Sequence, residues 1–161
     1  MKIVSGDNKA LNNLIHYSSS SLLLSKIYST LQICPGDKPY GLWVSDDNAV
    51  QDWLSWVKGE NFNVNKYIVK NKITINKQAK ILLLSDFDDL VHFTANFKFE
   101  NPNSWTGIKW QKVEKIYDGI LITPYIWKGR FNNKTPWYYG WDCASRCIWN
   151  HKAIKDVQSE N

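Results

Sequence analysis

Residues 15–47 constrain the fold most, because two short strand patterns enclose one helix pattern there. The stretch begins IHYSSSS and ends CPGDKPYGLWVSDD. Residues 14–17 are typical of a short strand, and Leu23, Ile27 and Leu31 recur at helical spacing, which predicts a helix over residues 20–31. A turn-rich loop then leads to a second strand at residues 40–45. Two strands around one helix can form a wall of a dinucleotide pocket.

Short strands and helices also alternate through the rest of the chain. Helix patterns cover residues 49–58, 87–93 and 110–117, and strand patterns cover residues 66–70, 72–75, 81–85, 119–127 and 146–149. The first dozen residues and the last six or so are polar, as terminal tails often are. The mixture indicates an α+β fold rather than a doubly wound parallel sheet. A length of 161 residues predicts a single domain, residues 1–161.

The composition excludes several classes of protein. No apolar run approaches the ~20 residues that span a bilayer, and the first residues lack a signal-peptide core, so we expect a cytoplasmic protein without a membrane partner. The cysteines, Cys34, Cys143 and Cys147, are odd in number and lack a framework spacing, which favours a reducing compartment. Because only three histidines are present, we expect no metal cofactor.

The charge and the tryptophan content each allow two interpretations. A net charge of +5, dominated by lysine, favours a polyanionic partner such as RNA or DNA, but it also fits a solvated lysine-rich surface. The nine tryptophans can stack on bases, sugars or nicotinamide, or they can fill a core. We expect most of them to be core residues.

Two side chains stand out as candidates for a binding site. His16 lies at the end of the first predicted strand, where a neutral imidazole can hydrogen-bond a ribose hydroxyl or serve only a structural role. Trp43, between Gly41 and Ser45, can stack on a planar ring. The other candidates for binding a cofactor lie in or near the same stretch: Tyr17, Ser18, Tyr28, Gly41, Ser45 and Trp53. Of these, Tyr28 either closes a pocket or simply packs, and we expect packing.

The two motifs resemble the first two motifs of the ADP-ribosyltransferase superfamily. Its diphtheria-toxin-like branch has an H-G-T strand end, a helix and a G-F-Y-S/T-D-N strand. By this resemblance His16 is the ribose-binding histidine and Trp43 the residue that stacks on nicotinamide, with Trp53 or Trp56 near the second stacking position. Tyr17 stands where many members have a glycine whose backbone holds the nicotinamide amide. The later stretches YDGILITPYIW and WYYGWDCASRCIW resemble small bacterial and phage proteins associated with this superfamily.

The resemblance implies an ADP-ribosyltransferase-like split β-sandwich with helices around an NAD cleft. It also implies an NAD-dependent mono-ADP-ribosyltransferase, a glycosyltransferase that uses NAD as its substrate, and a toxin of a toxin–antitoxin or anti-phage system. Such an enzyme cleaves the nicotinamide–ribose bond through a transition state that resembles an oxocarbenium ion, and a nearby carboxylate stabilises it.

The catalytic carboxylate is where the sequence departs from the family. The family glutamate lies on a late strand, whereas none of Glu60, Glu100, Glu114 and Glu160 falls in a predicted late strand. Asp118, at the mouth of the strand predicted over residues 119–127, is the first replacement candidate, although an Asp-Gly pair is also typical of a turn. Asp142, in the loop before the last predicted strand, is the second candidate.

Several acceptors and partners remain open at this point. The basic charge favours a nucleic-acid acceptor, RNA before DNA, and a protein acceptor is the alternative. The resemblance implies a cognate antitoxin protein as a further partner. Two other functions fit the same residues: a non-catalytic, aromatic-rich, basic module that binds RNA or DNA, and an NAD glycohydrolase that uses water as the acceptor.

Overall fold

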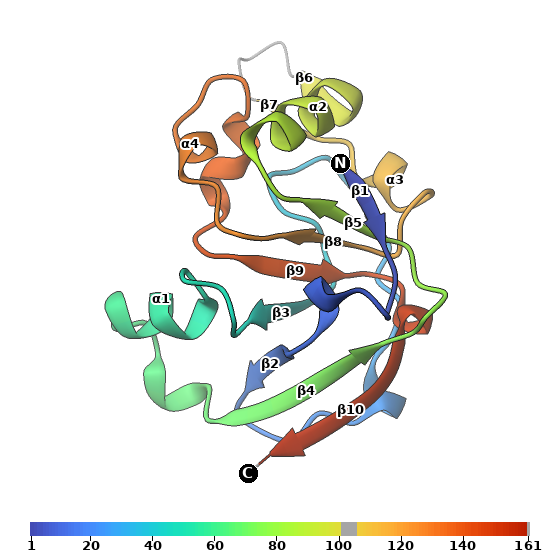
Figure 1. Cartoon of the computed structure of the whole chain (residues 1–161), viewed down its shortest axis with the longest axis vertical. Helices are drawn as coiled ribbons and strands as arrows, with labels where there is room; N and C mark the ends of the chain where they lie inside the picture. The colour runs from blue at the N-terminus through green and yellow to red at the C-terminus, as the bar shows by residue number, and fades with distance from the viewer. Residues whose placement is uncertain (101–105, 161) are drawn as a thin grey trace.

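The computed structural model describes residues 1–100 and 106–160, and within these ranges ten strands form two sheets (Figure 1). The larger sheet is curled and has eight strands, of which β5 and β8 pair in parallel and the other neighbours are antiparallel. In spatial order its strands are β1 (Lys2–Val4), β5 (Ile81–Leu84), β8 (Gly119–Ile122), β9 (Ser145–Ile148), β3 (Leu42–Asp46), β2 (Leu14–Ser18), β4 (Val69–Ile75) and β10 (Ile154–Glu160). A separate ribbon pairs β6 (Lys98–Glu100) with β7 (Thr106–Ile108).

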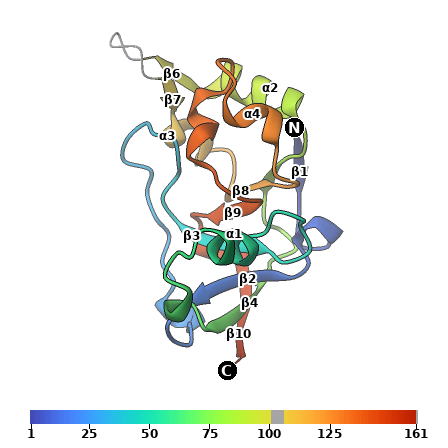
Figure 2. The same cartoon turned by 90° about the vertical axis from the view of Figure 1, so that its left-hand side faces the viewer.

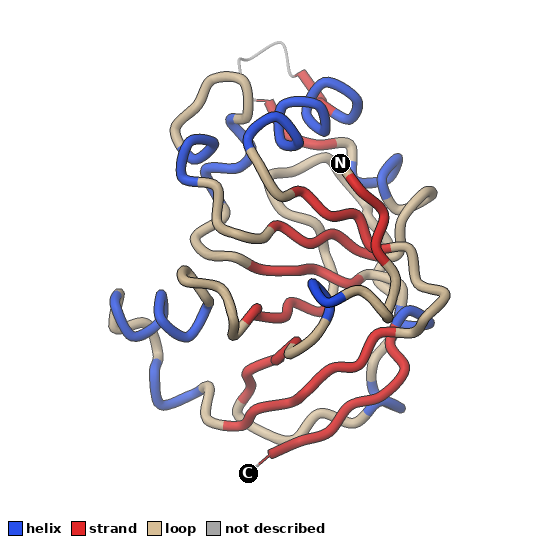
Figure 3. The backbone as a smooth tube through the Cα atoms, viewed as in Figure 1, coloured by secondary structure: helices blue, strands red, loops and turns tan. Residues whose placement is uncertain are grey.

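The helices are short and lie mainly around the β5–β8–β9 half of the sheet, with α1 beside β3 (Figures 1 and 3). Aspartates cap the two longest: Asp52 accepts a hydrogen bond from Ser55 N (2.7 Å) before α1, and Asp86 accepts one from Asp89 N (2.8 Å) before α2. The α-helices are α1 (Trp53–Gly59), α2 (Phe87–Phe97), α3 (Trp110–Val113) and α4 (Trp127–Arg130). The 3-10 turns are η1 (Lys9–Leu11), η2 (Leu24–Lys26), η3 (Val64–Lys66), η4 (Pro136–Gly140) and η5 (His151–Ala153).

Both faces of the central strands are buried, which explains the continuous apolar run of β8. Ile120 and Ile122 point into the cluster on the helical side, and Leu121 points into the cluster on the other side. Four of the eight described tryptophans are fully or almost fully buried in the helical-side cluster: Trp110, Trp137, Trp141 and Trp149. Core positions therefore account for half of the described tryptophans, not for most of them as expected. Trp105 lies outside the described residues. Among the described residues, no helix has the length and apolar character needed to cross a membrane.

The α+β class is confirmed, and the predicted strands at residues 14–17, 40–45, 81–85 and 146–149 correspond to β2, β3, β5 and β9. The helix predicted over residues 20–31 is wrong, because only η2 is helical there and the rest is loop. Ile27 packs partly buried against the core, but Leu23 and Leu31 are exposed, so this stretch does not bury one continuous apolar face as an amphipathic helix would. The many serines of this stretch also compete for backbone hydrogen bonds and disfavour a helix.

Several boundaries and both expected tails also differ from prediction. Residues 2–4 and 154–160 form β1 and β10, because each finds a neighbouring strand to pair with: β1 pairs with β5, and β10 pairs with β4. The strand predicted over residues 119–127 ends at Ile122, shortly before Pro124, which has no N–H for a ladder. The strands predicted at residues 66–70 and 72–75 are one strand, β4, preceded by η3. Three predicted helices are present with other bounds. The helix predicted over residues 49–58 is α1, the one predicted over 87–93 is α2, and the one predicted over 110–117 is α3.

A buried arginine ties β9 to the neighbouring strand and to the N-terminal segment. The guanidinium of Arg146, 1% exposed, donates to Ser45 O (3.2 Å) and to Ala10 O, and it pairs with Asp46 Oδ2 at 3.3 Å. Burial lowers the pKa of Arg146 to about 10, and the nearby carboxylates of Asp46 and Asp47 oppose that shift. The charge is therefore held in the interior by its partners.

Replacing Arg146 by leucine is expected to lower the free energy of unfolding by about 3 kcal/mol, because the Asp46 carboxylate then stays buried without its cation. Urea denaturation followed by tryptophan fluorescence measures the change. The double variant Asp46→Asn, Arg146→Leu is expected to recover part of the loss, since it removes the uncompensated charge. Equal stability of the single and double variants contradicts this role for the ion pair.

Candidate active site

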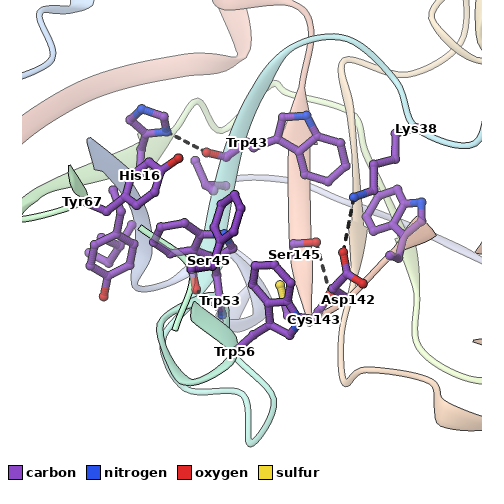
Figure 4. A pocket seen from close by; sticks show the side chains of 15 residues that line it. His16, Lys38, Trp43, Ser45, Trp53, Trp56, Tyr67, Asp142, Cys143 and Ser145 are labelled. Carbon is purple, nitrogen blue, oxygen red and sulfur yellow. Dashed lines mark hydrogen bonds and ion pairs between the residues drawn. The ribbon is translucent and has the colours of Figure 1, made fainter. Parts of the chain in front are cut away.

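The sheet opens between β2 and β3, and a cavity lies at this opening. The two strands pair only at Leu14–Asp46 and Ile15–Ser45; beyond these pairs β2 continues along β4, and β3 along β9. The cavity has a volume of about 430 Å³, within the range of small-molecule sites. It is lined by Ile15, His16, Tyr17, Lys38, Trp43, Val44, Ser45, Trp53, Trp56, Phe62, Tyr67, Trp141, Asp142, Cys143 and Ser145 (Figure 4).

A hydrogen bond from His16 crosses the opening. His16 Nδ1 lies 2.8 Å from the backbone oxygen of Trp43, at the point where the backbone ladder between β2 and β3 has ended (Figure 4). Because a carbonyl oxygen can only accept, Nδ1 carries the hydrogen. The Nε2 atom of the neutral ring is therefore a hydrogen-bond acceptor, as binding a ribose hydroxyl requires.

Aromatic rings from separate elements form the walls of the cavity. Trp43 on β3 makes an edge contact with Trp141 (centroids 4.9 Å apart), and Lys38 Nζ lies 5.7 Å from the Trp43 ring centroid. Trp53 on α1 stacks on Tyr17 (5.2 Å, 25° between the planes) and meets Tyr67 edge-on at 4.8 Å. The walls thus offer several ring faces and edges to a planar ligand (Figure 4).

The polar end of Tyr17 is already engaged. Its hydroxyl donates to Asp47 Oδ2 at 2.7 Å, and burial together with that hydrogen bond raises the pKa of Tyr17 well above its usual value. Tyr17 therefore stays protonated and contributes its ring. Ser45 is engaged in a similar way, since its Oγ accepts a hydrogen bond from Trp53 N at 3.2 Å and so joins β3 to the first turn of α1.

Asp142 supplies a carboxylate to the cavity wall. Its Oδ1 lies 3.2 Å from Arg130 Nη2, and its Oδ2 lies 3.7 Å from Lys38 Nζ (Figure 4 shows the second pair). All three side chains are partly exposed, so the ion pairs are screened by water and serve to orient the carboxylate rather than to stabilise the fold. Asp142 thus places a negative charge beside the aromatic walls.

The structure does not bring Asp118, the first carboxylate candidate, to this cavity. Ser145, which lines the cavity, is the first residue of β9, and Ile148 is the last. Gly119 pairs with Ile148, so Asp118, which precedes Gly119, lies at the end of β9 that is farther from the cavity. Its carboxylate accepts hydrogen bonds from Lys80 N (2.8 Å) and Asn150 Nδ2 (2.7 Å), and it borders a separate polar cavity. Asp118 acts as the turn residue that its Asp-Gly sequence also allowed. Of the two aspartate candidates, Asp142 lines this cavity and Asp118 does not.

The expectation that no glutamate lies on a late strand is also corrected. Glu160 is the last residue of β10, a strand mistaken for a tail because its hydrophobicity is low. It pairs with Lys70, which in turn pairs with Tyr17, so Glu160 lies two strands from Tyr17 and is exposed. Glu160 does not line the cavity, and the side chain of Glu100 lies outside the described residues.

Three further candidates lie outside the cavity. Gly41 has a φ of +156°, and a Cβ there would come 2.6 Å from Ile148 O, so this glycine is needed for the close approach of β3 and β9. Ser18 Oγ donates to Ser20 O (2.6 Å) and accepts from Asn71 Nδ2 (2.8 Å). Tyr28 is 76% exposed in a loop, and the packing expected for it is not seen.

The candidates that the fold does bring together are His16, Tyr17, Trp43, Ser45, Trp53 and Asp142. The cavity adds residues that were not singled out as candidates: Lys38, Phe62, Tyr67, Trp141, Cys143 and Ser145. Trp56 also lines the cavity. It lies three residues after Trp53 and therefore on the same side of α1, and this helical spacing is the local feature that predicts its position. Cys143 is not a reactive thiol, because burial and the neighbouring Asp142 raise its pKa to about 12.

Within the part of the chain that the structure describes, no group of three or more His, Cys, Asp or Glu side chains is placed to hold a metal ion. Comparisons of the chain with protein-family models, with curated proteins and with solved structures gave no match. The function is therefore inferred from the residues and the geometry of the cavity.

Proposed function

We propose that this protein is an NAD-dependent mono-ADP-ribosyltransferase whose cavity binds the nicotinamide riboside end of NAD. The observation that carries the proposal is the bridge between the two motifs: His16 and Trp43 line one cavity and are joined by a 2.8 Å hydrogen bond where the sheet opens. The fold proposed with it is a split β-sandwich, in which the opening between β2 and β3 is the split. The resemblance of residues 15–47 to the superfamily supports both parts.

The reaction breaks the bond between C1′ of ribose and the nicotinamide nitrogen. The bonding electron pair leaves with nicotinamide and neutralises its pyridinium charge, while positive charge develops on the ribose. An acceptor nucleophile then bonds to C1′ and loses a proton. The group transferred is ADP-ribose, so no oxidant or reductant is needed.

Four of the lining residues have defined roles in this proposal. His16 Nε2 accepts a hydrogen bond from a ribose hydroxyl, and the rings of Trp43 and Trp53 hold the nicotinamide. Asp142 offers a carboxylate that stabilises the developing positive charge and can accept the proton of the nucleophile. Much of the remaining rate enhancement comes from positioning the two reactants.

The biological part of the proposal follows the resemblance and the charge. The protein acts in the cytoplasm as a toxin of a toxin–antitoxin or anti-phage system, and a cognate antitoxin restrains it. A net charge of +5 supports a nucleic-acid acceptor, RNA before DNA, with protein as the alternative acceptor.

Incubation with NAD labelled in its adenosine part tests the proposal. We expect release of nicotinamide and transfer of label to one of three separate pools of RNA, DNA or protein, with RNA labelled most strongly. Chromatography measures nicotinamide, and gel electrophoresis of each pool locates the label.

Other outcomes of that incubation decide between the alternatives. If free ADP-ribose forms and no macromolecule is labelled, the protein is an NAD glycohydrolase and not a transferase. Label on protein alone refutes the nucleic-acid acceptor. If NAD remains intact with all three pools, the enzymatic function is refuted. A non-catalytic module that binds nucleic acid is then the remaining alternative.

A further inference from the structure

One hairpin outside the cavity exposes three large aromatic rings. Residues 127–139, here called the aromatic hairpin, run from α4 through a turn into η4. Within it Trp127 is 58% exposed, Phe131 79% and Tyr139 58%. Figure 2 shows α4 and the loop after it on the face of the molecule that also presents α1. Large exposed rings gathered in one short segment are typical of a binding surface.

The hairpin is held from its buried side, so the exposed rings are displayed on a fixed support. Thr135 Oγ1 donates to Gly129 O at 2.9 Å, and Tyr138 Oη accepts a hydrogen bond from Ile126 N at 3.1 Å. Gly129 packs so closely that a Cβ there would lie 2.5 Å from Leu90 Cδ1. Because these contacts hold the backbone of the segment in place, less of it has to be ordered when the rings meet a ligand.

One guanidinium lies beside two of the rings, and the segment carries no acidic residue of its own. The hairpin contains Lys128, Arg130 and Lys134 and no Asp or Glu. The centre of the Arg130 guanidinium lies 5.7 Å from the Phe131 ring and 6.0 Å from the Tyr139 ring, and the two rings are 5.6 Å apart. Exposed rings combined with positive charge match the chemistry of a strand with unstacked bases and phosphates.

We propose that the aromatic hairpin binds single-stranded nucleic acid. Bases stack on Phe131, Tyr139 and Trp127, and the phosphates meet Lys128 and Lys134, since Arg130 is paired with Asp142. A duplex fits poorly, because its bases are stacked on one another and cannot reach the rings. The binding does not depend on NAD chemistry.

The hairpin also meets the cavity, which gives its ligand a place in the proposed reaction. Arg130 pairs with Asp142 at 3.2 Å, and Asp142 lines the cavity. A strand lying on the hairpin thus passes the mouth of the cavity, where a nucleotide can act as the acceptor. This last step rests on the proposed function, and it names single-stranded nucleic acid as the acceptor.

Fluorescence anisotropy with a labelled twelve-nucleotide single-stranded RNA tests the binding in the absence of NAD. We expect Phe131→Ala and Tyr139→Ala each to weaken binding about tenfold, because each removes one stacking surface. Lys134→Gln is expected to reduce the slope of log affinity against log salt by about 0.7. Leu31→Ala is the control, since Leu31 is about as exposed as Phe131 but lies in another segment; its affinity is expected to equal that of the wild type.

Two results overturn the inference: unchanged RNA affinity in the Phe131→Ala, Tyr139→Ala double variant, or equal affinity for the strand and for its twelve-base-pair duplex. Nicotinamide release without RNA, measured on the same variants, separates this inference from the proposed function. A wild-type protein that releases nicotinamide but does not bind the RNA rejects the hairpin alone. RNA binding that needs the hairpin, in a protein that leaves NAD intact, upholds the hairpin and rejects the enzyme.

Discussion

Replacing His16 by asparagine is expected to reduce nicotinamide release from NAD about 100-fold while the fold persists. An asparagine amide can still donate to the Trp43 carbonyl, as Nδ1 does, but nothing then replaces the Nε2 acceptor. His16→Ala and Trp43→Ala are expected to abolish turnover, the second through loss of the stacking surface. Nicotinamide is quantified by chromatography under saturating NAD, and circular dichroism checks the fold.

Matched variants separate binding from packing at the same positions. Trp43→Tyr keeps an aromatic face and is expected to retain most of the activity. His92→Asn changes an exposed histidine on α2 and is expected to leave nicotinamide release within twofold of the wild type. Wild-type rates in folded His16→Asn and Trp43→Ala proteins reject the site.

Asp142→Asn is expected to lower the rate of nicotinamide release about 100-fold with a smaller change in the KM for NAD. Asparagine keeps the shape of the side chain and an oxygen for Arg130, but it removes the charge that stabilises the ribose in the transition state. Steady-state kinetics over a range of NAD concentrations separates the two parameters.

Two other carboxylates serve as comparisons for Asp142. Asp118→Asn is expected to retain activity within twofold, because Asp118 borders a different cavity. Glu160→Gln tests the carboxylate two strands from Tyr17, and we expect a loss below threefold, since Glu160 does not line the cavity. A large loss in Glu160→Gln together with an active Asp142→Asn moves the catalytic role to β10.

Local pattern predicted the strands better than the helices. The strands β2, β3 and β5 stand close to their predicted positions, because each is a short apolar run between turn residues. The helix expected over residues 20–31 failed although its apolar spacing is helical, because Leu23 and Leu31 find no surface to cover. The polar end strand β10 was missed, since its backbone pairing with β4 leaves little trace in a pattern of side chains.

Some residues of the candidate site could likewise be predicted from local sequence, and others could not. His16 and Trp43 could be named from sequence because each lies in a short motif with a recognisable neighbourhood. Asp142 ranked below Asp118, and Lys38 and Trp141 were not singled out, because loops place all three in the cavity and no local spacing records that. Gly41 was assigned to the ligand, yet its φ and its contact with Ile148 show a role in strand packing.

The sequence by itself determined the α+β class and the two motifs that bring His16 and Trp43 into consideration, because periodicity and residue type act over a few neighbouring residues. Only the tertiary structure decided that β2 and β3 separate after two pairs, that His16 bridges the opening, and that Asp142 rather than Asp118 lies there. These features depend on contacts between residues far apart in the chain. Such contacts are fixed by the packing of the whole sheet, and a local pattern does not encode them.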